Sequence, residues 1–216
     1  FAALLMRAFT QSAWFAEIRG TPQDLVAGGI VDSLPVEWFT TDKRGIATRY
    51  STDVSVSEFQ ERDLSEMGLM PLSKVKNTIY SAFYSNQSAQ VPKTYTTLVA
   101  SVNARLSAMI QYVMCVSRFA HFIKIIGRDR VGAFATPEEC ELYLQKWLRQ
   151  YCMANESPSI ELRARYPLRE GKIKVHELPG KPGSFACTVH LQPHFQFDDV
   201  VSAFKLVTEL APSAAA

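Results

Sequence analysis

Hydrophobic residues recur along the chain at two spacings, one typical of helices and the other of strands. The first helix is predicted at the start of the chain, where apolar residues follow one helical face: Phe1, Leu4, Leu5, Ala8 and Phe9. A glycine-containing loop follows, and short extended segments are expected at 36–39 and 46–50, with a turn between them. The N-terminal part is therefore expected to mix helix and strand.

A second helix is predicted to begin after Ser57. The Ser57 hydroxyl can accept a hydrogen bond from the first turn, and Gln60 can bond back to the Ser57 backbone, which is the capping-box arrangement. Gly68 is placed to end this helix, because glycine takes the left-handed conformation without steric cost. A hairpin with strands at 69–75 and 78–84 is expected next.

The longest helix is predicted at 98–128, after a polar, aperiodic stretch that marks a domain boundary near residue 95. Its apolar residues alternate in steps of four and three, with Val113 and Val116 in the middle of the stripe. Further apolar residues make the stripe wider than a two-stranded coiled coil needs. We expect a core helix about 45 Å long, at 1.5 Å per residue, that packs against a sheet.

Two shorter helices are predicted after it. Thr136 can cap the first, Pro137 fills a first-turn position that needs no N–H, and Glu139 completes a capping box. The second is expected to open at 157–158 and to stop before Pro167.

The C-terminal part is predicted to form a small, mostly antiparallel sheet. Its strands at 172–178 and 185–191 alternate in polarity, and the segment 179–183 turns between them. Residues 202–210 fit either a strand or a helix, and we favour a strand preceded by one turn at 197–201. The apolar residues of the hairpin are Ile173, Val175, Phe185, Cys187, Val189 and Leu191.

The predicted fold class is α/β of the α+β kind, in two mixed parts at 1–95 and 96–216, the second with long helices on its small sheet. A composition of 47% hydrophobic and 20% charged residues is typical of a folded globular protein. The formal net charge of +2 does not favour nucleic-acid binding. No apolar run reaches the about 20 residues of a membrane helix, and no signal-peptide pattern is present. Because the chain opens at Phe1 inside an amphipathic stretch, we expect an upstream part to be missing.

No group of residues predicts catalysis, a metal or a cofactor. The four cysteines are widely spaced among apolar neighbours, so we expect reduced, buried thiols of a cytoplasmic protein rather than a zinc site. His190 and His194 flank Pro193 in an extended segment and share no helix face. The segment 180–184 resembles a phosphate loop only superficially, because prolines in and beside it lack N–H groups. We therefore expect no enzyme.

Basic residues gather between 161 and 181, where six of them stand against three acidic residues. Such a cluster is either a solvated face or a docking surface for an acidic partner, since clustered charge steers association and sets its register. The candidate docking residues are Arg163, Arg165, Arg169, Lys172 and Lys174.

Sequence blocks in order along nearly the whole chain resemble one protein family. They are AEIRG at 16–20, LP at 34–35, EMGLMPL at 66–72, NARLS at 103–107, CVSRFAHFIK at 115–124, RDRVG at 128–132, ARYPL at 164–168, PGKPG at 179–183 and LQPHF at 191–195. The ordered set, rather than any single block, resembles the TssC/VipB family, the large sheath subunits of bacterial type VI secretion systems.

The resemblance implies a structural, non-enzymatic role. In this family a small subunit (TssB/VipA-like) pairs with the large one to build a helical sheath around an Hcp tube. Contraction propels the tube and its effectors, a ClpV-type ATPase recycles the sheath, and a baseplate supports it. The chain would be a C-terminal half, with 1–95 in the middle sheath domain and 96–216 as the conserved inner domain.

The inner domain in this family resembles phage tail sheaths, and strands of neighbouring copies complete its sheet. The six apolar hairpin residues named above are thus the candidate inter-subunit sheet, and the five basic residues a candidate surface toward the tube or a neighbour. The resemblance also implies a location in the bacterial cytoplasm, with no nucleic acid bound and no membrane insertion.

Two other classes are alternatives. A cytoplasmic enzyme domain would need a site completed by a missing N-terminal half, and this chain supplies no nucleophile, base or metal set. A nucleic-acid module would interleave basic residues with exposed aromatics, whereas the aromatics here fall mostly on apolar faces.

Overall fold

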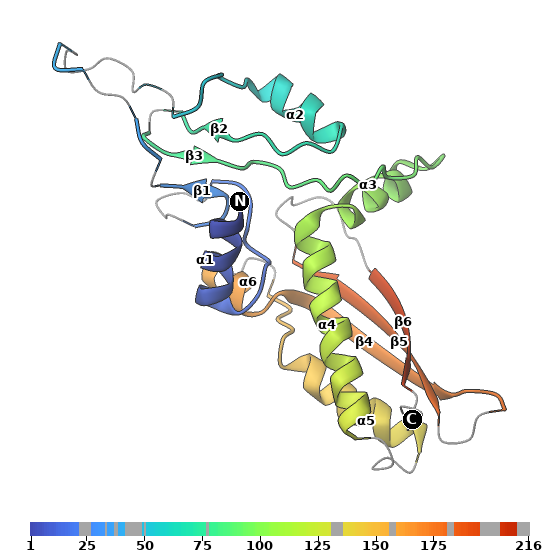
Figure 1. Ribbon diagram of the computed structural model, residues 1–216. Coiled ribbons are helices and arrows are strands. Elements are labelled where there is room, and N and C mark those ends of the chain that lie inside the picture. Colours follow the sequence, from blue (N-terminus) through green and yellow to red (C-terminus); the bar gives the residue numbers. More distant parts are fainter. Residues whose placement is uncertain are drawn as a thin grey trace, which may run out of the picture. The chain divides into compact units, whose positions relative to one another are not determined.

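The computed structural model describes residues 1–21, 27–32, 34–36, 39–41, 49, 51–76, 78–130, 136–155, 159–180, 184–194 and, for the backbone, 204–210. The chain divides into two compact units, each described by itself (Figure 1). The first comprises Phe1–Lys93 and Ala108–Gln111, and the second comprises Thr94–Ser107 and Tyr112–Ala216. Helices mixed with two small antiparallel sheets confirm the predicted α+β class.

The first unit opens with the predicted helix, α1 (Ala2–Ser12), which ends where Ala13 takes the left-handed conformation at φ 61°. Leu4 and Ala8 turn one face of α1 into the core, where they meet Ile18 and Phe83. The ring of Phe1 packs edge-on against Phe83 at 5.3 Å. The apolar periodicity therefore identified both the helix and its buried face.

A three-stranded antiparallel sheet follows, in the order β1-β3-β2 (Figure 1). The predicted hairpin is present in shortened form as β2 (Ser73–Lys74) and β3 (Ser81–Ala82). The third strand is β1 (Ile30–Val31), which was not predicted from the sequence. The strand expected at 36–39 is not formed at Val36 and Phe39, and the segment expected at 46–50 lies outside the described residues except Arg49.

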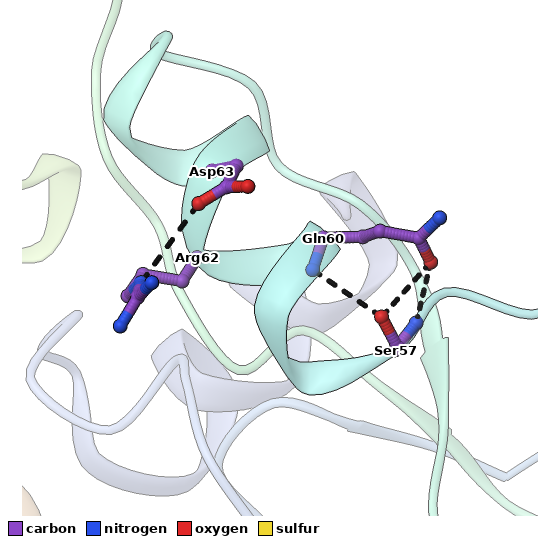
Figure 2. Close-up of polar contacts among 4 residues, drawn as sticks. All are labelled: Ser57, Gln60, Arg62 and Asp63. Atoms are coloured by element: carbon purple, nitrogen blue, oxygen red, sulfur yellow. Dashed lines mark hydrogen bonds and ion pairs between the residues drawn. The ribbon is translucent and has the colours of Figure 1, made fainter.

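The capped helix α2 (Glu58–Glu66) is confirmed with its capping box (Figure 2). The Gln60 N–H donates to the Ser57 hydroxyl at 3.4 Å, and the Ser57 N–H donates to the Gln60 side chain at 3.0 Å. Gly68 follows with φ +82°, the left-handed value that favours glycine.

The long helix predicted at 98–128 is wrong as one element, because the chain forms α3 (Leu98–Ser107) and α4 (Ile110–Asp129). Between them Met109 pairs with Gln87 in an isolated antiparallel bridge. The Ser88 N–H donates to the Ala108 carbonyl at 3.0 Å, and the Ile110 N–H donates to the Asn86 carbonyl at 2.9 Å. Residues 107–110 contain no glycine or proline, so this pairing breaks the helix against local propensity.

The buried face of α4 agrees with the predicted stripe only in part. Val113 is 43% exposed, whereas the residues that face the core are Tyr112, Cys115, Phe119 and Ile123. The break at Ala108–Met109 restarts the helix in a new register, and the stripe read through 98–128 does not continue across it. Burial of Val113 was therefore a wrong prediction.

The second unit contains the two short helices. In α5 (Pro137–Arg149), Pro137 opens the first turn and the Glu139 N–H donates to the Thr136 hydroxyl at 3.3 Å, as predicted. The helix α6 (Ile160–Arg165) is capped by Ser159, and it ends before Pro167 as predicted. The start expected at 157–158 lies outside the described residues.

The C-terminal sheet is antiparallel, in the order β4-β5-β6: β4 (Leu168–Glu177), β5 (Phe185–Pro193) and β6 (Phe204–Leu210). Ile173 lies opposite Val189, which lies opposite Leu206 on its other side. Both hairpin strands are confirmed, and the ambiguous segment at 202–210 is a strand. The turn expected at 197–201, like residues 181–183 of the connecting turn, lies outside the described residues.

The helix whose backbone lies closest to β4 is α5. Packing of the longest helix on the sheet stays a prediction. The apolar residues Cys140, Leu144 and Leu148 of α5 are at most 1% exposed. Phe119 of α4 packs in turn on the α5 side, with its ring 6.0 Å from Trp147 and 5.7 Å from Tyr151. In the second unit, α5 therefore lies next to β4, and Phe119 connects α4 to the aromatic side chains of α5 and of the residues that follow it.

Candidate assembly surface

The six candidate residues of the inter-subunit sheet lie on one face of β4 and β5. The register places Ile173 opposite Val189, Val175 opposite Cys187 and Gly171 opposite Leu191. Ile173, Cys187, Val189 and Leu191 are at most 2% exposed, and Val175 and Phe185 are partly buried. These side chains therefore form the core of the unit, so any linkage to another chain would run through the backbone at the sheet edges.

One of those edges, the outer edge of β4, is occupied by side chains of α5. Gln145 donates from Nε2 to the Gly171 carbonyl at 2.9 Å and accepts the Ile173 N–H at Oε1 at 2.8 Å. In an antiparallel pair, alternate residues direct both backbone groups to the same side. Gly171 and Ile173 are two residues apart, so one side-chain amide occupies two outward backbone groups that an adjacent strand would bond.

Glu141 continues this contact one helical turn earlier. Its carboxylate accepts the Val175 N–H at 2.9 Å. Residues four apart lie on the same face of a helix, so Glu141 and Gln145 follow β4 over the span from Gly171 to Val175. The sequence analysis missed both residues, although their spacing beside the apolar positions Cys140, Leu144 and Leu148 was visible.

Close approach of α5 to β4 depends on the absence of a side chain at Gly171. A Cβ at this position would lie 2.6 Å from Leu148 Cδ2 and 3.3 Å from the Cys152 sulfur. Leu148 is 0% exposed and has little room to move aside. Packing against Leu148 therefore favours glycine at this position, because Gly171 does not adopt the left-handed backbone conformation.

Among the strands that the structure describes, β6 lies at the opposite edge of the sheet. Because Ile173 and Val175 direct their N–H groups away from β5, the intervening Lys172 and Lys174 pair with β5. The alternation then directs the backbone of Val189 toward β6, opposite Leu206, and that of Val207 toward the outer edge.

The five candidate basic residues are spread over two elements. Arg163 and Arg165 lie in the last turn of α6, and Arg169, Lys172 and Lys174 lie in β4. Lys172 and Lys174 are exposed on the sheet face opposite the apolar one, where Glu170 and His176 flank them.

His194 links the other part of the basic cluster. Burial lowers the pKa of His194, and the positive charges of Arg163 and Arg169 lower it further. The structure thus brings Arg163 and Arg169 near one imidazole, while Lys172 and Lys174 lie farther along β4. The neutral imidazole is favoured because a third positive charge here would be both desolvated and repelled.

The cysteine thiols are unsuited to nucleophilic chemistry. Burial raises the pKa of Cys115 and Cys187 to about 12, and mainly burial raises that of Cys140 and Cys152 to about 11. All four are free. A thiolate is the reactive form, and these values keep the protons on at neutral pH.

Within the described parts of the chain, no three His, Cys, Asp or Glu side chains gather as a metal site would require. Among the helices whose residues are described, none is both long and apolar enough to cross a bilayer.

Comparison with known proteins gives two adjoining family matches. Residues 1–90 match the family described as EvpB/VC_A0108, tail sheath N-terminal domain, and residues 99–210 match EvpB/VC_A0108, tail sheath gpW/gp25-like domain. The second match covers the unit that contains β4, β5 and β6. The fold and these matches define a tail sheath protein, as the sequence resemblance predicted.

A curated relative narrows the class. The chain is 35% identical over 214 residues to the type VI secretion system sheath protein TssC1 of Pseudomonas aeruginosa strain PAO1. The match covers 99% of this chain and 42% of the relative, so the chain spans less than half of that protein's length. The chain belongs to the TssC/VipB family of type VI secretion sheath large subunits.

Proposed function

We propose that the chain is a non-enzymatic structural part of a contractile type VI secretion sheath in the bacterial cytoplasm. It pairs with a TssB/VipA-like small subunit and with copies of itself in a helical tubule around an Hcp tube, which contraction drives outward together with effectors. A ClpV-type ATPase and a baseplate are the indirect partners. Family membership supports this assignment, and so do thiols whose raised pKa values disfavour covalent catalysis.

The observation that carries the proposal is the edge strand β6 of a sheet in a tail sheath domain. An edge strand presents backbone donors and acceptors to which a strand of another chain can bond. In this proposal, residues 1–95 belong to the middle sheath domain and residues 96–216 form the inner domain whose sheet neighbours extend. The basic residues of α6 and β4 face the tube or an adjacent subunit.

The register of β6 supplies a paired test in the full-length protein, co-produced with its small subunit. Val207→Pro removes an N–H that the alternation directs outward, so we expect folded protein that forms no tubes by electron microscopy. Leu206→Pro removes an N–H directed at Val189 and should instead destabilise the sheet itself. Normal tubes from Val207→Pro protein would refute linkage through this edge.

Proline at Val175 or Val189 would not test the linkage. The Val175 N–H is bonded to Glu141, and the Val189 backbone faces β6, so both changes would damage contacts within the chain.

The basic surface can be tested by reversing the charge of Lys172 and Lys174 with substitutions to Glu. These substitutions should impair tube formation without unfolding the protein. Unaltered tubes would identify these two residues as a solvated face.

A further inference from the structure

The two edges of the β4-β5-β6 sheet are not equivalent, and the difference comes from two side chains. At β4, the Gly171 carbonyl, the Ile173 N–H and the Val175 N–H all bond to α5 through Gln145 and Glu141, at 2.8–2.9 Å. These are three of the outward groups that a strand added to the middle of β4 would bond. At β6, the last described strand of the sheet, the alternation directs the backbone groups of Val207 away from β5.

The blocking side chains are held firmly in place. Cys140, Leu144 and Leu148 interleave with Glu141 and Gln145 along α5 and are at most 1% exposed. Leu148 also packs where a side chain at Gly171 would lie, so α5 cannot shift along β4 without losing that contact. Glu141 and Gln145 are themselves only partly exposed, so water competes weakly for their bonds.

We propose that Gln145 and Glu141 close the β4 edge to strand addition and so direct neighbouring strands to the β6 edge. This inference rests on the proposed function, in which strands of neighbours extend the sheet. A copy with two open edges could be extended in two ways, and only one of them can fit a helical lattice of fixed order. Covering an unused edge with side chains is a means by which proteins prevent incorrect pairing.

The test opens the β4 edge while the packing of α5 is kept. In the natural protein that carries this chain, without its partner subunit, Glu141→Met and Gln145→Met remove all three bonds. Methionine retains side-chain length and helix propensity. Glu138→Met and Lys146→Met, at exposed positions of the same helix, are the matched controls.

Two measurements report on the edge itself. In dilute protein, hydrogen exchange of the Ile173 and Val175 amides should become about tenfold faster or more in the double variant, and unchanged in the controls. In concentrated protein, Lys172→Cys or Lys174→Cys on exposed positions of β4 should form disulfide-linked dimers only when the edge is open. Unchanged exchange, or cross-linking no greater than in the controls, would overturn the inference.

Single variants keep the test decisive if the double variant does not fold. Gln145→Glu keeps an acceptor for the Ile173 N–H but sets a carboxylate oxygen against the Gly171 carbonyl, so we expect partial opening and some cross-linking. Glu141→Gln keeps an acceptor for the Val175 N–H, although a weaker one, so we expect exchange of that amide to rise by much less than tenfold and no cross-linking. Equal behaviour of these two variants would contradict the assigned roles.

The outcome is separable from that of the proposed function. Edge opening is measured in unassembled protein, whereas sheath formation is measured as tubes with the small subunit. If wild-type protein formed no tubes, the sheath assignment would fail and the exchange result would still stand. If tubes formed and the opened edge neither exchanged faster nor cross-linked, only the present inference would fail.

Discussion

Gly171→Ala is expected to destabilise the second unit although it adds only one methyl group. The new Cβ would lie 2.6 Å from Leu148 Cδ2 and 2.9 Å from Leu148 Cγ, well inside van der Waals contact. Overpacking of a filled core costs about 1–3 kcal/mol. Alanine restricts the unfolded chain and returns about 0.4–1 kcal/mol, so the net loss should be about 1–2 kcal/mol.

The assay is a double-mutant cycle on the free energy of unfolding, measured with denaturant. Leu148→Ala alone should cost about 2–5 kcal/mol because it leaves a cavity under a residue that is 0% exposed. In the combined variant, the alanine at 171 would occupy part of that cavity. The loss of stability of the double variant should therefore be smaller than the sum of the two single losses. Lys172→Ala, next along β4 but exposed, is the control and should change stability by less than about 0.5 kcal/mol.

Strict additivity of the two losses would show that Gly171 and Leu148 are not in contact. A Gly171→Ala protein as stable as wild type would have the same meaning, because the packing argument allows no space for the methyl group. If Lys172→Ala lost as much stability as Gly171→Ala, the effect would come from alanine in strand β4 and not from the contact with Leu148.

Three further predictions concern other parts of the chain. Asn86→Leu should cost about 1–3 kcal/mol in denaturant unfolding, because Asn86 Nδ2 donates to Gln111 Oε1 at 2.9 Å in a buried pair; loss within about 0.5 kcal/mol would contradict this. Phe119→Ala should cost about 3–5 kcal/mol, while Val113→Asp, at a position 43% exposed, should cost far less; the reverse order would refute the assigned face of α4. The pKa values of the four cysteine thiols are raised above 9, so the protonated thiols favour the folded state; stability should be full below about pH 9 and fall toward about pH 12, and a flat profile would contradict these raised pKa values.

Local signals predicted the parts of the fold that short-range interactions determine. The caps at Ser57 and Thr136 form because a side-chain oxygen and the N–H groups of one turn are all within a few residues. The hairpin of β4 and β5 was predicted because alternation reports a sheet with one buried face. Such features need no knowledge of distant segments.

Features that depend on distant segments were missed. The break between α3 and α4 exists because residues 108–110 pair with 86–88, and nothing within 107–110 disfavours a helix. The apolar stripe was accordingly read through a point at which the register restarts, and Val113 was assigned to the wrong side. Strand β1 is only two residues long, too short to show alternation, and it is stabilised by pairing with β3.

The edge contact of α5 was missed for a further reason, which lies in the chemistry of the two side chains. At position 145 the helix meets a carbonyl and an N–H at once. Of the Gln and Glu side chains, only the amide of Gln both donates and accepts, and a carboxylate would repel the Gly171 oxygen. At position 141 it meets an N–H, and a carboxylate accepts that bond more strongly than an amide does. The pattern thus consists of Glu and Gln four residues apart, interleaved with buried apolar residues and followed by a strand that contains glycine. A different contact with the strand favours each of these residue types. This pattern can be used to search for helices that cover strand edges. On a helix face exposed to solvent, no contact would favour Gln at one of these positions and Glu at the other.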